Sequence, residues 1–333
     1  MNDDDNKPQW LRATIPSMKR RCDGHDYRSR CIYMITLVVD QRRPLLGHIT
    51  GDGISQAATM HPTALGSAIL AELSQITRHY PAIQIIAHQL MPDHLHFIIY
   101  VRDTISRHLS HVISSYKVGC NRLYRSACPG EASTGLWESG FHDRILKGKN
   151  HLQRMMDYID DNPRRAAIKR HHRDYFAIQR NVQAAGLTYA ALGNLFLLQA
   201  PLLLQVQCTR KLTPEVTRDA IQYYLEQARH GAVLVSPCIS PGEKAVMRAA
   251  FLAGYPTIIL LENGFAPLAK PGGQRFDACA RGRLLLLAPW EHHNDKRRIK
   301  QSQCHALNDM AAAICSAHPQ PRQPWHSHGS RRP

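Results

Sequence analysis

The sequence has no long uninterrupted apolar run, no cysteine pair at metal-binding spacing, and much less acidic than basic charge. Its most apolar stretch, residues 192–208, is broken by Asn, Gln and Pro, which argues against a membrane span. The nine cysteines are odd in number and include no C-x-x-C pair, which argues against a disulfide framework and a cysteine zinc site. The first residues are acidic and lack the basic and apolar regions of a signal peptide. We therefore expect a cytoplasmic protein.

Positive charge is what the chain has in excess. Its 333 residues include 42 Lys and Arg against 26 Asp and Glu, a formal net charge of +16. Residues 1–180 hold 25 basic and 17 acidic side chains, and residues 181–333 hold 17 and 9, so both halves are basic. This charge favours a polyanionic partner, although a basic surface that only keeps the protein in solution fits it equally well.

Two histidines in residues 91–101 form the most informative pattern. Pro92-Asp93 is a turn pair, and the apolar, β-rich residues after it predict a turn that leads into a strand. Because side chains alternate between the faces of a strand, His94 and His96 are expected to point the same way, and the apolar residues next to them the other way. The pair could be half of a metal site, or two surface histidines on a half-exposed strand.

A second pattern lies in residues 150–163. Apolar residues at helical spacing predict a helix over 150–161, and Pro163 is expected to end it. Tyr158 and Asn162 are four residues apart, so they share one face near the helix end. Tyr158 could also be an ordinary packed tyrosine, and Asn162 could merely cap the helix.

A strand with His-hydrophobic-His, followed by a helix with Tyr and a polar ligand four residues later, resembles the HUH single-strand DNA nucleases. Among them, three segments resemble the REP-associated tyrosine transposases: Met-Pro-Asp-His-Leu-His at 91–96, Leu-Trp-Glu-Ser-Gly-Phe-His-Asp-Arg-Ile at 136–145, and Tyr-Ile-Asp-Asp-Asn-Pro at 158–163. The resemblance covers residues 31–170. His-x-His alone is a weak motif, but the three segments in this order and spacing are specific.

The resemblance implies an endonuclease and transposase that cleaves and rejoins single-stranded or hairpin DNA through a 5′-phosphotyrosine. It implies Tyr158 as the nucleophile and His94, His96 and Asn162 as ligands of a divalent cation. Mg²⁺ or Mn²⁺ fits this mixed donor set, although two histidines could also hold Zn²⁺. Whether the enzyme acts as a monomer or a homodimer stays open. The further candidates are His142 and Asp143, as support beside the ligands, and Arg107, Lys117, Arg122, Arg144, Arg164 and Arg165, as DNA contacts.

Periodicity predicts strands at 31–39, 82–90 and 141–146, a histidine strand after residue 93, and helices at 62–80 and 104–125. The order β-α-β-β-α-β is typical of an α+β ferredoxin-like domain, and the HUH resemblance implies the same fold for residues 31–170. We expect a flexible basic arm at 1–30 and a basic linker at 171–187.

Residues 188–317 are predicted to form a second, α/β domain. Buried strands at 232–236, 257–261 and 283–288 alternate with helices at 214–229 and 243–253, which indicates a parallel sheet of Rossmann-like topology. Residues 231–264 resemble the core of the DNA-processing (Smf-type) family, which binds single strands. The Gly-Arg-Gly loop of that family is replaced by residues 239–243, and the basic loop at 264–275 is a candidate substitute. Residues 318–333 are expected to be disordered.

Ser240 and Glu243 have the spacing of a capping box, with Pro241 at the first helical position. A structural reading is a well-made helix start. A functional reading is a phosphate-binding site at this helix N-terminus, formed by Ser240, Gly242 and Lys244.

Two other functions remain open for the histidine and tyrosine patterns. A non-catalytic DNA-binding protein that retains the fold would be unaffected by loss of the Tyr158 hydroxyl. A metal-dependent phosphoesterase that uses His94 and His96 without covalent catalysis would hydrolyse small nucleotides and form no protein–DNA adduct.

Overall fold

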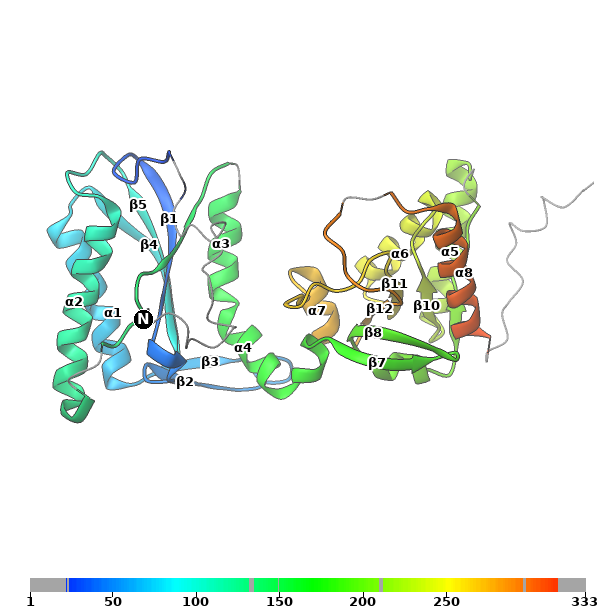
Figure 1. The fold of residues 1–333 in the computed structure, drawn as a ribbon, viewed down its shortest axis with the longest axis horizontal. Helices are drawn as coiled ribbons and strands as arrows, with labels where there is room; N and C mark the ends of the chain where they lie inside the picture. The colour runs from blue at the N-terminus through cyan, green and yellow to red at the C-terminus, as the bar shows by residue number, and fades with distance from the viewer. Residues whose placement is uncertain are drawn as a thin grey trace, which may run out of the picture. The chain divides into compact units, whose positions relative to one another are not determined.

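The computed structural model describes residues 22, 24–131, 135–148, 150–209, 212–295 and 298–316. The chain divides into two compact units, residues 1–167 and 168–333, whose helices and strands are drawn in Figure 1. The predicted tail at 318–333 and most of the predicted arm at 1–30 lie outside the described residues. None of the helices in the described part of the chain combines the length and hydropathy that a membrane crossing requires.

The first unit is built on a four-stranded antiparallel sheet with the order β4-β5-β1-β6. Its main elements are β1 (Cys31–Val38), α1 (Ala64–His79), β4 (Ile83–Met91), β5 (His94–Val101), α2 (Leu109–Ala127) and β6 (His142–Ile145). This is the element order that periodicity predicts, so the mixed helix and strand composition with an antiparallel sheet is confirmed. The finer ferredoxin-like assignment stays a prediction.

The two faces of this sheet are covered by different helices (Figure 1). Leu95 and Phe97 of β5 pack in the main core with Ile69 of α1 and Val112 of α2. Ile98, which alternates with them along β5, packs on the other face with Ile159 of α3 (His151–Asp160). The alternation expected for the histidine strand is therefore present, and it places His94 and His96 on the α3 side of the sheet.

Pro163 does not end the helical part of the chain. α3 ends at Asp160, and a second helix, α4 (Asn162–His171), begins at once with Pro163 in its first turn. Proline is tolerated there because the first residues of a helix need no N–H donor. The expectation of a helix break near Pro163 is right, but the chain continues as a helix where the sequence predicts a stop.

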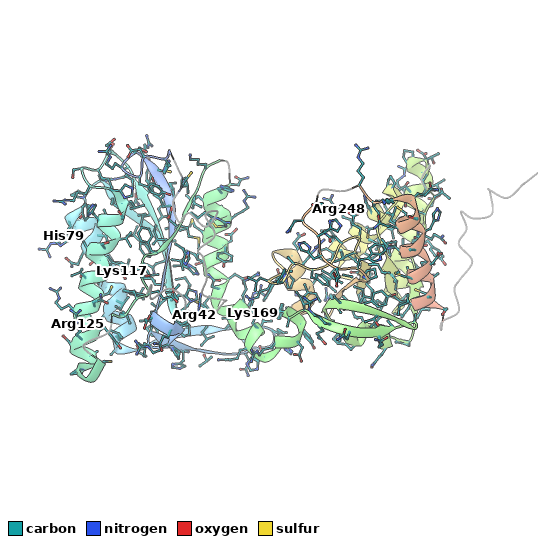
Figure 2. All side chains as sticks on the ribbon, in the orientation of Figure 1. Arg42, His79, Lys117, Arg125, Lys169 and Arg248 are labelled. Atoms are coloured by element: carbon teal, nitrogen blue, oxygen red, sulfur yellow. The ribbon has the colours of Figure 1, made fainter. Side chains whose placement is uncertain are left out.

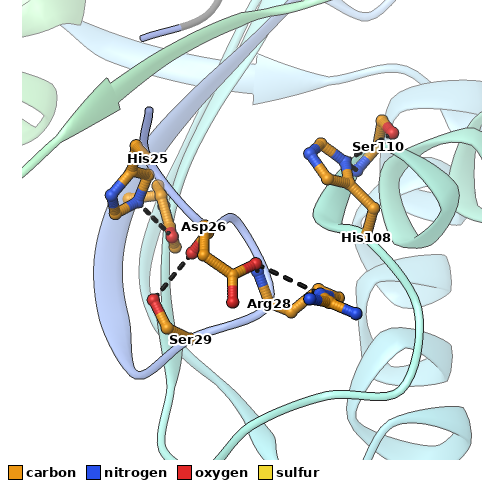
Figure 3. A network of polar contacts seen from close by, with 7 residues as sticks. His25, Asp26, Arg28, Ser29, His108 and Ser110 are labelled. Atoms are coloured by element: carbon orange, nitrogen blue, oxygen red, sulfur yellow. Dashed lines mark hydrogen bonds and ion pairs between the residues drawn. The ribbon is translucent and has the colours of Figure 1, made fainter. Parts of the chain in front are cut away.

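The segment before β1 packs on the sheet, so residues 24–30 are not part of a flexible arm. Tyr27 is buried and its ring stacks on that of Tyr33 at 5.6 Å. His25 Nε2 lies 2.8 Å from the Tyr33 hydroxyl. Figure 3 shows the turn of this segment, where Asp26 Oδ1 accepts a hydrogen bond from Arg28 Nε at 3.1 Å.

The sequence did not predict the small elements between β1 and α1 or after α2. A short 3-10 helix, η3 (Asp40–Arg42), follows β1, and the hairpin of β2 (Gly47–Thr50) and β3 (Thr59–Pro62) forms a sheet of its own. A further short helix, η4 (Pro129–Glu131), follows α2. Gly66 in α1 allows the helix to lie against the loop before β2, because a Cβ there would lie 2.0 Å from the Leu46 carbonyl oxygen.

The second unit has a six-stranded mixed sheet with the order β7-β8-β12-β11-β10-β9. The strands β9 (Leu203–Gln205), β10 (Val233–Ser236), β11 (Thr257–Leu260) and β12 (Leu284–Ala288) are parallel. One face packs against α8 (Gln301–Cys315), and the other against α5 (Pro214–Arg229), α6 (Pro241–Ala253) and α7 (Gln274–Ala280). The predicted parallel strands are confirmed, whereas the Rossmann-like topology stays a prediction.

Two antiparallel strands extend this sheet beyond the predicted ones. β7 (Gln179–Ala184) and β8 (Leu187–Gly193) pair with each other, and β8 pairs with β12. The short helix η5 (Arg173–Phe176) precedes them, and η6 (Leu195–Gln199) follows. Residues 171–187, predicted to be a linker, therefore carry a strand of the second sheet. β7 has the sequence Gln-Arg-Asn-Val-Gln-Ala, in which a single branched apolar residue gives no alternation to detect.

Candidate active site

The two histidines of β5 lie side by side on the α3 face, with their ring centroids 4.7 Å apart. His94 Nδ1 lies 2.6 Å from Asp93 Oδ1, and His96 Nδ1 lies 2.7 Å from Thr36 Oγ1 of β1. Among the described residues, neither Nε2 atom has a hydrogen bond to protein. Burial lowers the pKa of His96 to about 3, so its ring is neutral at physiological pH. A neutral imidazole with a free Nε2 is the form that ligates a metal.

Tyr158 of α3 lies beside this pair, in the same chain. The centroid of its ring is 6.2 Å from that of His96, and the side chain is 42% exposed. The other apolar residues of α3 pack against the sheet. An exposed phenol next to a histidine pair differs from an ordinary packed tyrosine, because its oxygen can be reached by a large substrate.

Asn162 lies between two residues, Ile159 and Ala167, that pack near the histidine strand. Ile159 shares a hydrophobic cluster with Ile98, two residues beyond the histidine pair on β5. Ala167 shares another cluster with Met91, which pairs with the first of the two histidines. Asn162 is 9% exposed, and its Nδ2 is a buried atom without a hydrogen-bond partner among the described residues. An unsatisfied buried amide costs about 1–3 kcal/mol, which is offset if the group meets a ligand.

The side chains of His142 and Asp143 lie on opposite faces of the sheet. His142 pairs with Thr36, which pairs with His96, so His142 lies in the histidine row of the sheet. Asp143 points to the opposite face, where its Oδ2 accepts a hydrogen bond from the buried Tyr27 at 2.9 Å. The position of Asp143 therefore contradicts the predicted support of the ligands, and gives this carboxylate a structural partner instead.

The predicted DNA-contacting cations fall into two groups. Arg144 of β6 lies on the α3 face and donates to Met155 Sδ at 3.7 Å. Arg164 and Arg165 lie at the start of α4, where both form ion pairs with Asp161. The remaining three are near or on α2, which covers the other face of the sheet: Arg107, Lys117 and Arg122.

Lys117 has a structural role that the sequence did not suggest. It lies on α2 (Figure 2) and donates hydrogen bonds to the carbonyl oxygens of Glu138 and Gly140, at 2.7 and 2.8 Å. Burial lowers the pKa of its ammonium group. Lys117 therefore holds the loop before β6, and its DNA contact stays a prediction.

The start of α6 supports the structural reading of the capping box. Glu243 is 2% exposed, and its Oε2 accepts from the backbone N–H groups of Ile239 and Ser240, at 2.8 and 3.3 Å. Ser240 Oγ accepts from Glu243 N. The serine and the buried carboxylate therefore form the predicted capping box. The phosphate site at Ser240, Gly242 and Lys244 stays a prediction.

Three residues beside the histidines were missed at the sequence level: Asp93, Thr36 and Arg42. Asp93 directly precedes His94, so a carboxylate next to a candidate ligand was an available signal. Thr36 of β1 pairs with His96 of the neighbouring strand β5. Arg42 Nη1 donates to Asp93 Oδ2 at 3.0 Å. Contacts between residues so distant in sequence cannot be predicted from a single sequence.

Comparison with known proteins gives a curated relative and several solved structures to which parts of this chain are similar. A protein of Haemophilus influenzae described only as uncharacterized is 22% identical over 163 residues, which cover 43% of this chain and 86% of that protein. A REP-associated tyrosine transposase bound to a REP hairpin has 17% identity over 46% of this chain and 85% of its own, with a TM-score of 0.32. DNA processing protein A from Helicobacter pylori has 19% identity over 42% of this chain and 66% of its own, also with a TM-score of 0.32.

A family match covers the segment that carries the histidines, Tyr158 and Asn162. Residues 27–162 match the family described as "Transposase IS200 like". The match spans β1 to the start of α4 and includes the first two motif segments and all but the last residue of the third. It supports a DNA transposase role for the first unit.

Proposed function

We propose that the first unit cleaves and rejoins single-stranded DNA at hairpin repeats through a 5′-phosphotyrosine at Tyr158. The observation that carries this proposal is the position of an exposed tyrosine ring 6.2 Å from that of His96. In the reaction, the Tyr158 oxygen forms a bond to phosphorus, and the bond from phosphorus to the 3′-oxygen breaks. The phenol proton is released and the 3′-oxygen takes up a proton. A later attack by a 3′-hydroxyl reverses these steps.

The residues around the histidines fit a divalent cation. Both rings have Nδ1 engaged and Nε2 free, and the Asn162 amide is buried with an unsatisfied atom. Amide nitrogen and oxygen are interchangeable by rotation, so the same position can present Oδ1. His94, His96 and Asn162 would hold Mg²⁺ or Mn²⁺. No cluster of three or more His, Cys, Asp or Glu suited to a metal occurs in the described ranges. A bound cation would neutralise and polarise the phosphate.

The test is covalent capture of DNA. Labelled hairpin oligonucleotides incubated with the full chain and Mn²⁺ are expected to give an adduct that resists denaturation, and EDTA is expected to prevent it. Hydrolysis of small nucleotides without an adduct would instead indicate the metal-dependent phosphoesterase. Binding of the oligonucleotide with neither product would indicate the non-catalytic DNA-binding protein.

We also propose that the second unit holds a DNA strand at a basic pocket of its own. A cavity of about 410 Å³ is lined by four cations and by apolar side chains, and its described lining residues include no Asp or Glu. Phe176 in its wall stacks on Phe276 at 4.6 Å, and Leu268 at its rim is 88% exposed. Cations beside apolar surface suit a phosphate backbone with its bases. The four cations are Lys169, Arg173, Arg180 and Lys270.

Loss of two cations from this pocket is expected to weaken DNA binding in a salt-dependent way. For Arg173→Ala/Arg180→Ala, the slope of log affinity against log salt should become shallower by about 0.7 per lost phosphate contact on a single strand. The matched control is Arg218→Ala/Arg229→Ala, which removes two exposed arginines paired with Glu215 and Glu226. Fluorescence anisotropy with single-stranded DNA measures both. Equal losses in the two variants would mean that only net charge matters and would contradict a site at the pocket.

A further inference from the structure

The carboxylate of Asp93 lies between a candidate metal ligand and a guanidinium. Its Oδ1 is 2.6 Å from His94 Nδ1, and its Oδ2 accepts from Arg42 Nη1 at 3.0 Å. Both oxygens of an ionised carboxylate are therefore committed, each to a different partner.

The turn that presents Arg42 is strained. Gln41 and Arg42 both have positive φ values, 56° and 53°, although neither is glycine. Such a conformation costs about 1 kcal/mol or more per residue and persists where the surroundings impose it. The surroundings here are backbone hydrogen bonds: Arg42 N donates to Val39 O at 2.8 Å, and Val39 N donates to Asp93 O at 2.9 Å. The strained turn and the turn before β5 are thus fixed to each other.

The Arg42–Asp93 ion pair stabilises the fold too little to offset this strain. The Arg42 side chain is 63% exposed and that of Asp93 is 25% exposed. Exposed ion pairs stabilise a fold by about 0–1 kcal/mol. This gain is smaller than the combined cost of the two strained residues, Gln41 and Arg42. What the contact does provide is a fixed position for the Asp93 carboxylate.

That position decides which nitrogen of His94 carries the proton. A carboxylate only accepts, so it requires a proton on Nδ1 and leaves the Nε2 lone pair free. Arg42 only donates, so it keeps Oδ2 as an acceptor. We propose that Asp93 and Arg42 are positioning residues that lock His94 in the tautomer with a free Nε2, ready for a divalent cation. This inference rests on the proposed function, because it gives the free Nε2 the role of a metal ligand.

The substitution Asp93→Asn tests whether Asp93 fixes the tautomer of His94. In Asp93→Asn, the amide oxygen must turn to Arg42, and the NH₂ group then faces His94 Nδ1. The ring can only accept from that group, so the proton moves to Nε2. Imidazole ¹⁵N shifts of the metal-free, DNA-free full chain, with the His94 signal identified by its loss in His94→Ala, are expected to show this change. The affinity for Mn²⁺ is expected to fall by about 10–100-fold, as for other partners of metal-bound histidines.

The double variant Asp93→Asn/Arg42→Ala separates positioning from a structural role. Without Arg42 the amide can turn its oxygen to His94, so the original tautomer and much of the Mn²⁺ affinity should return. An unchanged tautomer in Asp93→Asn, or no recovery in the double variant with the fold intact by circular dichroism, would overturn the proposal. The tautomer is read without DNA or metal. A tautomer change in a protein that forms no DNA adduct therefore supports the lock while the proposed transposase reaction fails.

Discussion

Tyr158→Phe is expected to abolish the covalent DNA adduct while leaving the fold and DNA binding in place. The substitution removes a single oxygen from a side chain that is 42% exposed, and the described hydrogen bonds include none made by that hydroxyl. No buried partner loses a hydrogen bond, so the free energy of unfolding should change little. The adduct depends on that oxygen alone as the nucleophile. Denaturing gel electrophoresis with labelled hairpin DNA and Mn²⁺ measures the loss.

A matched control uses another tyrosine at the protein surface. Tyr100→Phe also removes one hydroxyl, in this case one that accepts from Arg30 Nε at 2.6 Å at the far end of β5. It should leave adduct formation unchanged. If Tyr158→Phe still forms the adduct at the normal rate, another residue is the nucleophile and the proposed function is wrong. If it forms none but binds DNA normally, the non-catalytic alternative is excluded.

The predictable part of this fold is the part whose side chains repeat at a fixed period. α5 has the bounds that periodicity predicts, Pro214–Arg229, and β12 differs from the prediction by one residue. The alternation in β5 correctly placed both histidines on one face, because one face of that strand is buried against α1 and α2. Elements without such a period, such as the β2–β3 hairpin, gave no comparable signal.

Within the candidate site, only the pairs of residues that are close in sequence could be predicted. His94 with His96, and Tyr158 with Asn162, follow from spacings of two and four residues. The contacts that join these pairs connect distant segments, as Thr36 does with His96. Charge was the least reliable guide: Lys117 binds carbonyl groups, Arg164 and Arg165 pair with Asp161, and Asp143 pairs with Tyr27. The sequence shows that a side chain is charged, but not which neighbour already uses the charge.

Removal of both β5 imidazoles is expected to eliminate specific cation binding. In His94→Ala/His96→Ala two of the three proposed ligands are lost, and the remaining amide alone is a weak ligand. The affinity for Mn²⁺ should fall by more than the about 10–100-fold that loss of an outer partner typically costs. Isothermal titration calorimetry on the DNA-free protein measures this directly. Adduct formation should disappear in the same variant, even at raised Mn²⁺.

The hairpin of β2 and β3 offers a matched control for that experiment. His48 and His61 face each other across its strands, with ring centroids 5.2 Å apart, and His61 Nε2 is already engaged by Thr50 Oγ1 at 2.9 Å. His48→Ala/His61→Ala therefore removes a second histidine pair of similar spacing that lacks two free Nε2 atoms. Its Mn²⁺ affinity should match that of the unmodified protein. Because His96 is buried, thermal unfolding of both variants must show that the fold survives. If the His94→Ala/His96→Ala protein is folded and still binds Mn²⁺ normally, the cation binds elsewhere. The proposed metal site would then be wrong.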